Sequence, residues 1–154
     1  MTLSRAPLGV LMLALIVTVG CGRLCPLGLG CRPSVQVTVE GSDDMNLGQA
    51  ATVVVVQLAG SAEFQQTPVE RFWTDAAGSL RADVVDRKRN LLLFPGESVG
   101  LDVPLHDDAR FIGVAANLRH PHTDQWRSRV AVDDLDGRAA VIRIESRRLT
   151  VALR

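Results

Sequence analysis

Hydrophobic and polar residues alternate strictly over Val35–Glu40, with three valines on one face and three polar residues on the other. This period of two predicts a strand that buries one face. A β-branched run, Thr52–Val56, continues into Gln57 and Leu58 and predicts a second, more buried strand. Gly, Ser, Asp and Asn gather in Gly41–Gln49, so we expect a loop between the two strands.

The pattern changes beyond Ser61, where apolar residues recur three or four positions apart. Ser61 and Thr67-Pro68 stand where helices begin, so Glu63–Gln66 and Val69–Trp73 are predicted to form short helical turns. The polar segment Ser79–Asn90 has no clear period, and at most another brief turn is expected there.

Strand patterns return after Asn90. The segment Leu91–Phe94 leads to the turn Pro95-Gly96-Glu97, and apolar residues then alternate over Val99–Leu105. Two strands around a tight turn predict a hairpin. Pro104 lacks a backbone N–H, which limits the second strand to a sheet edge or makes the proline its last residue.

Four further segments have strand character: Phe111–Leu118, Trp126–Val132, Ala140–Ile144 and Leu149–Leu153. The first is a long apolar run and is predicted to lie centrally in a sheet. Asp136-Gly137 supplies a tight turn before the third. Seven or eight strands with regularly spaced turns predict an all-β domain over residues 34–154, an antiparallel β-sandwich.

The first twenty residues have the pattern of an export signal. Arg5 is the only charged residue in Met1–Gly20, and it precedes an apolar run from Leu8 to Val19. A run of about a dozen residues is shorter than the roughly 20 that a membrane-spanning helix requires. A removable signal peptide over residues 1–20 is therefore predicted.

The sequence Thr18-Val19-Gly20-Cys21 resembles a lipobox, in which an apolar stretch and a small residue precede a cysteine that is lipidated. Thr18 departs from the leucine usual at its position. We expect a diacylglycerol and an acyl chain on Cys21 and no other cofactor; each acyl CH₂ contributes about 0.8 kcal/mol to membrane binding. Gly22 stands where an aspartate would resemble an inner-membrane retention signal, so the outer membrane is favoured. The alternative is an ordinary secretory signal with an incidental cysteine.

Residues 21–33 are rich in Gly, Pro and Cys and have no strand or helix period. We interpret them as a tether between the lipid and the domain. Export would place Cys25 and Cys31 in an oxidising compartment, where their spacing permits a disulfide but does not require one.

Charge and motif content argue against several classes of function. The 17 basic and 17 acidic residues balance, so nothing electrostatic favours nucleic-acid binding. His120 and His122 could offer two ring nitrogens to a metal, with Asp124 or distant His106 as further ligands, but an exposed loop is the preferred interpretation. Ser98 lies in a Gly-x-Ser-x-Gly sequence, Gly96–Gly100, but a turn and a strand are predicted there and not the strand-to-helix turn of a nucleophile elbow. No glycine-rich segment has the spacing of a nucleotide loop. The sequence therefore predicts no enzyme, no metal and no small-molecule substrate.

Several short motifs follow the lipobox in a definite order. They are Val35–Val39, Asn46, Val53–Leu58, Phe64, Phe72-Trp73, Leu93–Glu97, Arg110–Ala116, Arg119 and Trp126-Arg127. In this order they resemble the outer-membrane lipoproteins of type VI secretion systems, the TssJ (SciN/VasD) family. The family's corresponding patterns are "vrvyQL" at Val53–Leu58, "L-x-P-G-E" at Leu93–Glu97, "a-r-Y-l-G-V-v-A" at Arg110–Ala116, and "f-R…W-R" at Arg119 and Trp126-Arg127. Thr52 and Val56 depart from the family's usual proline and tyrosine.

The resemblance implies a sandwich of two four-stranded sheets with a short helical insertion, tethered to the cell outer membrane and facing the periplasm. It implies a partner in the secretion membrane complex, the periplasmic C-terminal domain of the inner-membrane protein TssM. In the family, the loop between the first two strands is implicated in that contact, which here points to Asp43, Asp44, Met45, Asn46 and Leu47. Met45 and Leu47 are apolar residues in a polar loop, which suits a partner contact. Alternatively, they fold back onto the edge of the sandwich.

Two other functions remain open. A generic ligand- or carbohydrate-binding surface lipoprotein would use the same sandwich and would need a pocket or an exposed aromatic platform near Trp73 or Trp126. Both tryptophans are expected in the core instead. A metal-dependent periplasmic enzyme would use His106, His120 and His122.

Overall fold

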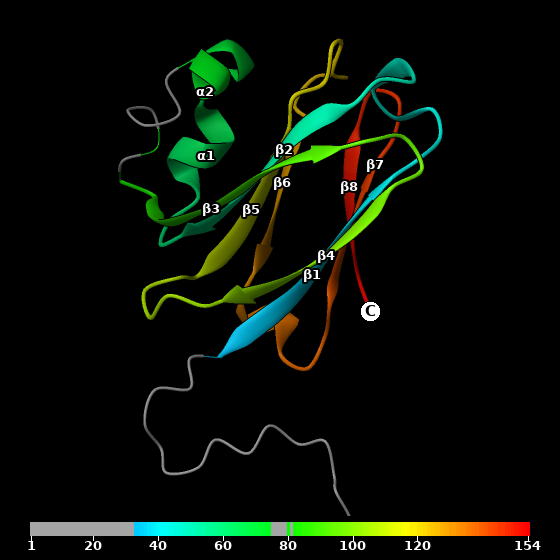
Figure 1. Cartoon of the computed structure of the whole chain (residues 1–154). Helices are drawn as coiled ribbons and strands as arrows, with labels where there is room; N and C mark the ends of the chain where they lie inside the picture. The colour runs from blue at the N-terminus through cyan, green and yellow to red at the C-terminus, as the bar shows by residue number, and fades with distance from the viewer. Residues whose placement is uncertain (1–32, 75–79, 81) are drawn as a thin grey trace, which may run out of the picture. The chain divides into compact units, whose positions relative to one another are not determined.

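In the part of the chain that the computed structural model describes, residues 33–74, 80 and 82–154 with only the backbone of residues 87–89, eight strands form two four-stranded sheets (Figure 1). Cys21, Cys25, Cys31 and the predicted signal peptide lie outside these residues. Within the described ranges, no helix is both long and apolar enough to span a membrane.

The two sheets match the predicted all-β sandwich. Sheet A has the order β4 (Ser98–Pro104), β1 (Ser34–Gly41), β7 (Ala140–Ile144) and β8 (Leu149–Leu153). Sheet B has the order β3 (Val84–Leu93), β2 (Ala51–Leu58), β5 (Phe111–Ala116) and β6 (Arg127–Ala131). Neighbouring strands are antiparallel except β1 and β7, which are parallel.

The core lies between the facing sides of the two sheets. Val37 and Val39 of β1 and Val53 and Val55 of β2 are fully buried, as the alternation in the sequence predicts. Burying one such side chain contributes roughly 1.5–3 kcal/mol, so these alternating positions hold the two sheets together. Strand β5 lies between β2 and β6, which confirms its predicted central place.

Two short helices, α1 (Ala62–Gln66) and α2 (Val69–Thr74), form the predicted helical insertion between β2 and β3. They cover part of the outer face of sheet B, where a Cβ on Gly113 of β5 would lie 3.1 Å from the Phe64 ring. Val56 and Leu58 face the same side and are buried there. The alternation in β2 therefore ends at Val55 because the insertion covers the face that would otherwise meet solvent.

Three features correct the expectations from sequence. The polar segment before Leu91 belongs to β3, which starts at Val84 and ends one residue before Phe94. The expected hairpin of Leu91–Phe94 with Val99–Leu105 does not form, because β3 lies in sheet B and β4 lies in sheet A. The turn between them crosses from one sheet to the other, with Gly96 in the left-handed region at φ 76°.

The connection between β6 and β7 also crosses between sheets. It contains a 3₁₀ turn, η2 (Asp133–Leu135), and Gly137 at φ 68°, so Asp136-Gly137 does not close a hairpin. The prediction for Pro104 is confirmed in both forms, since β4 is an edge strand and Pro104 is its last residue.

Candidate functional site

Four connections meet at the end of the sandwich where β1 finishes, and we refer to them as the loop end (Figure 1). They are the β1–β2 loop (42–50), the β3–β4 turn (94–97), the β5–β6 loop (117–126) and the β7–β8 turn (145–148). Backbone hydrogen bonds join them: Gly96 N donates to Gly41 O at 3.1 Å, and His122 N donates to Arg147 O at 2.9 Å. Asn46 N donates to Glu145 O at 3.3 Å. The four connections therefore form one continuous surface.

Asn46 fixes the shape and the position of the β1–β2 loop. Its side chain is 3 % exposed; Nδ2 donates to Ala50 O at 2.9 Å, and Oδ1 accepts from Arg119 N at 2.8 Å. Asn46 has φ 47°, in the left-handed region, which asparagine tolerates better than most residues. Because its two bonds reach the loop itself and the β5–β6 loop, one amide side chain holds both loops in place.

The five residues predicted to contact a partner divide into two groups. Met45 and Asn46 are buried, and Met45 lies under the loop, its sulfur 2.8 Å from where a Cβ on Gly41 would be. Asp43, Asp44 and Leu47 are exposed. Folding back onto the sandwich therefore describes Met45, whereas Leu47 faces outward.

Leu47 occupies an unfavourable place for a leucine. It has φ 59°, and it lies between Asn46 and Gly48, which are also left-handed. This conformation costs a residue with a Cβ about 1–2 kcal/mol. The side chain is 51 % exposed, so burial does not offset that cost. Strained backbone conformations are typical of functional sites, and exposed apolar residues that gather into a patch are typical of binding surfaces.

Large hydrophobic side chains are exposed at three described positions, and all three belong to the loop end or adjoin it. Besides Leu47, they are Leu92, which is 59 % exposed, and Phe94, which is 54 % exposed. The sequence did not reveal Leu92 and Phe94 as surface residues, because an apolar run before a turn is the ordinary pattern of a strand.

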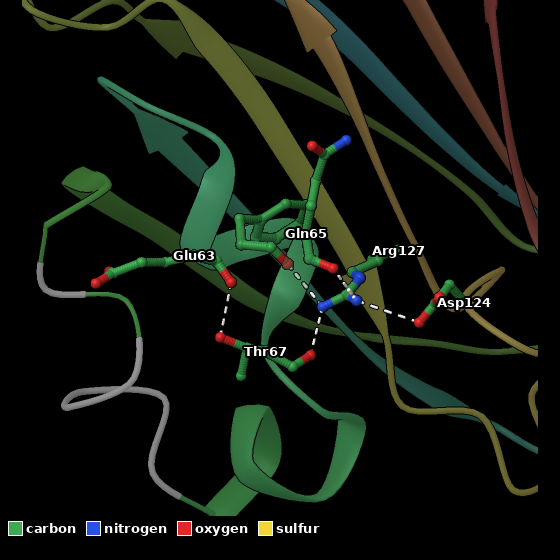
Figure 2. Close-up of polar contacts among 6 residues, drawn as sticks. Glu63, Gln65, Thr67, Asp124 and Arg127 are labelled. Atoms are coloured by element: carbon green, nitrogen blue, oxygen red, sulfur yellow. Dashed lines mark hydrogen bonds and ion pairs between the residues drawn. The ribbon is translucent and has the colours of Figure 1, made fainter.

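Arg127 of β6 joins the helical insertion to sheet B (Figure 2). Its Nη1 donates to Phe64 O at 2.7 Å and to Thr67 O at 2.5 Å, and its Nη2 donates to Gln65 O. These carbonyls lie at the end of α1, where helical carbonyl groups lack partners within the helix. One guanidinium therefore caps the helix and ties it to the sheet.

The surroundings of Arg127 keep its guanidinium in place. Its side chain is 8 % exposed, lies 4.5 Å above the Trp126 ring, and forms an ion pair of 3.2 Å with Asp124. Burial lowers the pKa of Arg127, and the Asp124 carboxylate opposes that shift. In the sequence, Arg127 was identified only as part of the Trp126-Arg127 motif, and no local pattern predicted that its side chain contacts α1.

The alternative sites suggested by sequence are not assembled. Within the described residues, no three His, Cys, Asp or Glu side chains gather where they could hold a metal ion. His120 and His122 lie at the loop end, whereas His106 follows β4 at the opposite end, where its Nδ1 accepts from Asp108 N. Trp126 is 1 % exposed and packs against Phe72 at 5.1 Å between ring centroids, so it lies in the core as predicted, whereas Trp73 is only half-buried against the core.

Comparison with known proteins gives the family. The family model for type VI secretion lipoproteins, described as VasD, EvfM and TssJ, matches residues 33–154. The chain belongs to the type VI secretion lipoprotein family. The resemblance inferred from the motif order is thereby confirmed, and the match extends to the end of the chain, beyond the motifs. No curated protein matches the chain.

Solved structures agree with this family. A chain of a structure described as "Type VI membrane complex" is 25 % identical, with a TM-score of 0.70, covering 77 % of this chain and 97 % of that chain. A chain of a structure described as the TssM C-terminal domain from EAEC is 24 % identical, with a TM-score of 0.68 and coverages of 77 % and 97 %. The type VI lipoprotein TssJ1 from Pseudomonas aeruginosa is 18 % identical, with a TM-score of 0.69 and coverages of 80 % and 97 %. The last two show the shared fold.

Proposed function

We propose that this type VI secretion lipoprotein anchors the secretion membrane complex to the outer membrane. Lipid on Cys21 would anchor the protein in the outer membrane, and the loop end would bind the periplasmic C-terminal domain of a TssM-like inner-membrane protein. Family membership supports the assignment to the complex, and chains of the same fold occur in structures described as the type VI membrane complex and the TssM C-terminal domain.

Leu47 is the observation that carries the proposed binding surface. Its exposure to solvent and its left-handed backbone are both unfavourable for a leucine, so a contact with another protein accounts best for the presence of leucine here. Asp43 and Asp44 beside it add charge that would orient a partner.

The two proposed attachments lie at opposite ends of β1. The tether joins the domain just before Ser34, whereas the loop end begins after Gly41. An eight-residue strand spans roughly 26 Å at about 3.3 Å per residue. The chain therefore enters the domain at the end of β1 that lies away from the proposed binding surface.

Binding is tested with the soluble domain, residues 33–154, which contains the whole described core. We expect this domain to bind the partner's periplasmic domain in titration calorimetry, and the double variant Asp43→Lys/Asp44→Lys to bind at least about tenfold more weakly. Asp133→Lys/Asp134→Lys is the matched control, because it reverses an exposed acidic pair in η2, at the other end of the domain. Absence of binding by the intact domain, or equal losses in both variants, would refute the proposed surface.

The anchor is tested in cells with the full chain. Cys21→Ser removes the lipid acceptor, so the protein should leave the outer-membrane fraction and type VI secretion should be lost. The purified full-chain variant should bind the partner's periplasmic domain as before, since Cys21 lies outside residues 33–154. Full secretion by the Cys21→Ser strain would show that the lipid anchor is dispensable.

A further inference from the structure

The last part of β3 is an edge strand with apolar side chains turned to solvent. Strand β3 pairs with β2 on one side and is the first strand of sheet B. Its final residues alternate: Leu91 and Leu93 pack toward the core, whereas Asn90 and Leu92 are exposed, as is Phe94 directly after the strand. In a strand of this kind, about half of the backbone N–H and C=O groups point away from the paired neighbour. These groups and the outward side chains lie on one accessible edge.

Two of the other three edge strands, β4 and β6, carry residues that discourage pairing. Strand β4 presents Asp102 and ends in Pro104, and β6 presents Arg129. Strand β8 turns only the small side chains of Thr150 and Ala152 outward. Charges and proline are the usual protection of an exposed edge against a further strand.

Strand β3 itself is protected over only part of its length. Four consecutive charged residues occupy positions 86–89, and the ladder to β2 is irregular between Val54 and Val55. Neither a charge nor a proline occurs in Asn90–Phe94. The edge is therefore left open where its exposed leucine and phenylalanine lie.

This open edge adjoins the β1–β2 loop. Gly96 N donates to Gly41 O at 3.1 Å, and a Cβ on Gly96 would lie 3.1 Å from Asp43 Oδ1. The Glu97 carboxylate accepts the backbone N–H of Phe94 at 2.9 Å. Acidic groups thus border the apolar edge, and a partner seated on the exposed face of the loop would reach both.

We propose that an extended segment of the same partner adds as a strand to the free edge of β3 at Asn90–Leu93. It packs an apolar side chain against Leu92 and Phe94 and directs a lysine or arginine toward Asp43. Strand addition takes its affinity from backbone hydrogen bonds and its specificity from such side-chain contacts. This inference rests on the proposed function, because it assigns a second contact to the partner that binds the loop end.

The test uses variants of the soluble domain that place charges on the edge. Leu92→Lys/Phe94→Lys changes the exposed residues directly before and after Leu93 and leaves the buried Leu93 in place, so the core is not altered. We expect at least about tenfold weaker binding to the partner's periplasmic domain. Thr150→Lys/Ala152→Lys is the matched control, because it adds two outward charges to edge strand β8, and it should bind like the unmodified domain.

Hydrogen exchange of the unmodified complex tests strand addition directly. Backbone amides on the free side of Asn90–Leu93 should exchange at least about tenfold more slowly when the partner is bound, since they acquire acceptors. Unchanged exchange there would overturn strand addition.

The outcomes separate this inference from the proposed function. Full affinity of Leu92→Lys/Phe94→Lys, with loss in Asp43→Lys/Asp44→Lys, overturns the β3 contact and leaves the function standing. No binding by the intact domain overturns both. A dimer of the domain alone that Leu92→Lys/Phe94→Lys dissociates would assign the edge to a second copy of this chain and also overturn the inference.

Discussion

Two segments leave the sheets of this domain, the β1–β2 loop and the α1–α2 insertion. Each is held by one polar side chain, but the side chain belongs to the segment in one case and to the sheet in the other. Arg127 reaches out from β6 and holds the insertion from outside it. Asn46 lies inside the loop and holds it through Ala50 and Arg119. In one case the sheet fixes the segment, and in the other the segment carries its own anchor.

The two segments also differ in what they expose. The insertion turns Phe64 and Phe72 inward, and both are 1 % exposed. The loop buries Met45 but leaves Leu47 half exposed in a left-handed conformation. In the insertion, the polar anchor Arg127 therefore supports a segment whose aromatic side chains are buried. In the loop, the polar anchor Asn46 holds a segment that keeps the apolar side chain of Leu47 exposed to solvent. Variants of the anchors and of Leu47 should separate stability from binding.

Arg127→Ala should have the largest effect on stability. It leaves the carbonyls of Phe64, Gln65 and Thr67 without their donor, which should lower the free energy of unfolding by about 3 kcal/mol in urea denaturation. Arg129→Ala is the control, because Arg129 is exposed and lies 4.7 Å above the Phe111 ring, and it should cost less than about 1 kcal/mol. Equal losses in the two variants would mean that the carbonyl contacts contribute little.

Asn46→Ala should lower both stability and binding. Two part-buried hydrogen bonds are lost and an alanine is forced into φ 47°, so we expect the free energy of unfolding to fall by about 2 kcal/mol in thermal denaturation. Affinity for the partner domain should fall because the loop loses its fixed shape. Asn117→Ala, at an exposed asparagine in the β5–β6 loop, should change neither quantity. Unaltered affinity in Asn46→Ala would show that the partner does not require the ordered loop.

Leu47→Asn should have the smallest effect on stability and should separate the two properties most clearly. Asparagine tolerates the left-handed region better than leucine, so the free energy of unfolding should stay the same or rise by up to about 1 kcal/mol. Affinity for the partner domain should fall about tenfold. Unchanged affinity would remove Leu47 from the proposed contact.

The strands that bury one face could be predicted from sequence, whereas the sheet to which each strand belongs could not. The valines of β1 and the long apolar run of β5 are found where the period of two and the run length place them. The hairpin prediction around Pro95-Gly96 was wrong, because the same turn residues can join strands within one sheet or between two. The polar start of β3 has no apolar period, and its pairing with β2 makes it a strand.

The β1–β2 loop could be predicted from sequence, but which of its residues are exposed could not. Met45 and Leu47 have the same apolar character in the same loop, and only the fold shows that one is buried and the other exposed. Leu92 and Phe94 were assigned to a strand before a turn, and their outward direction depends on which sheet continues beyond the turn. The reach of Arg127 to α1 depends on a contact between residues some 60 positions apart in sequence, which no local pattern encodes.

The parallel pairing of β1 with β7 bears on how the chain crosses a membrane before it folds. Val37 of the first strand pairs with Ala140, and β7 lies between β1 and the last strand, β8. When the chain emerges N-terminus first from an export channel, as the predicted signal peptide implies, sheet A cannot close until Ile144 has emerged. Such non-local pairing also folds slowly. In an exported chain, this topology would delay completion of sheet A until nearly all of the polypeptide has reached the far side of the membrane.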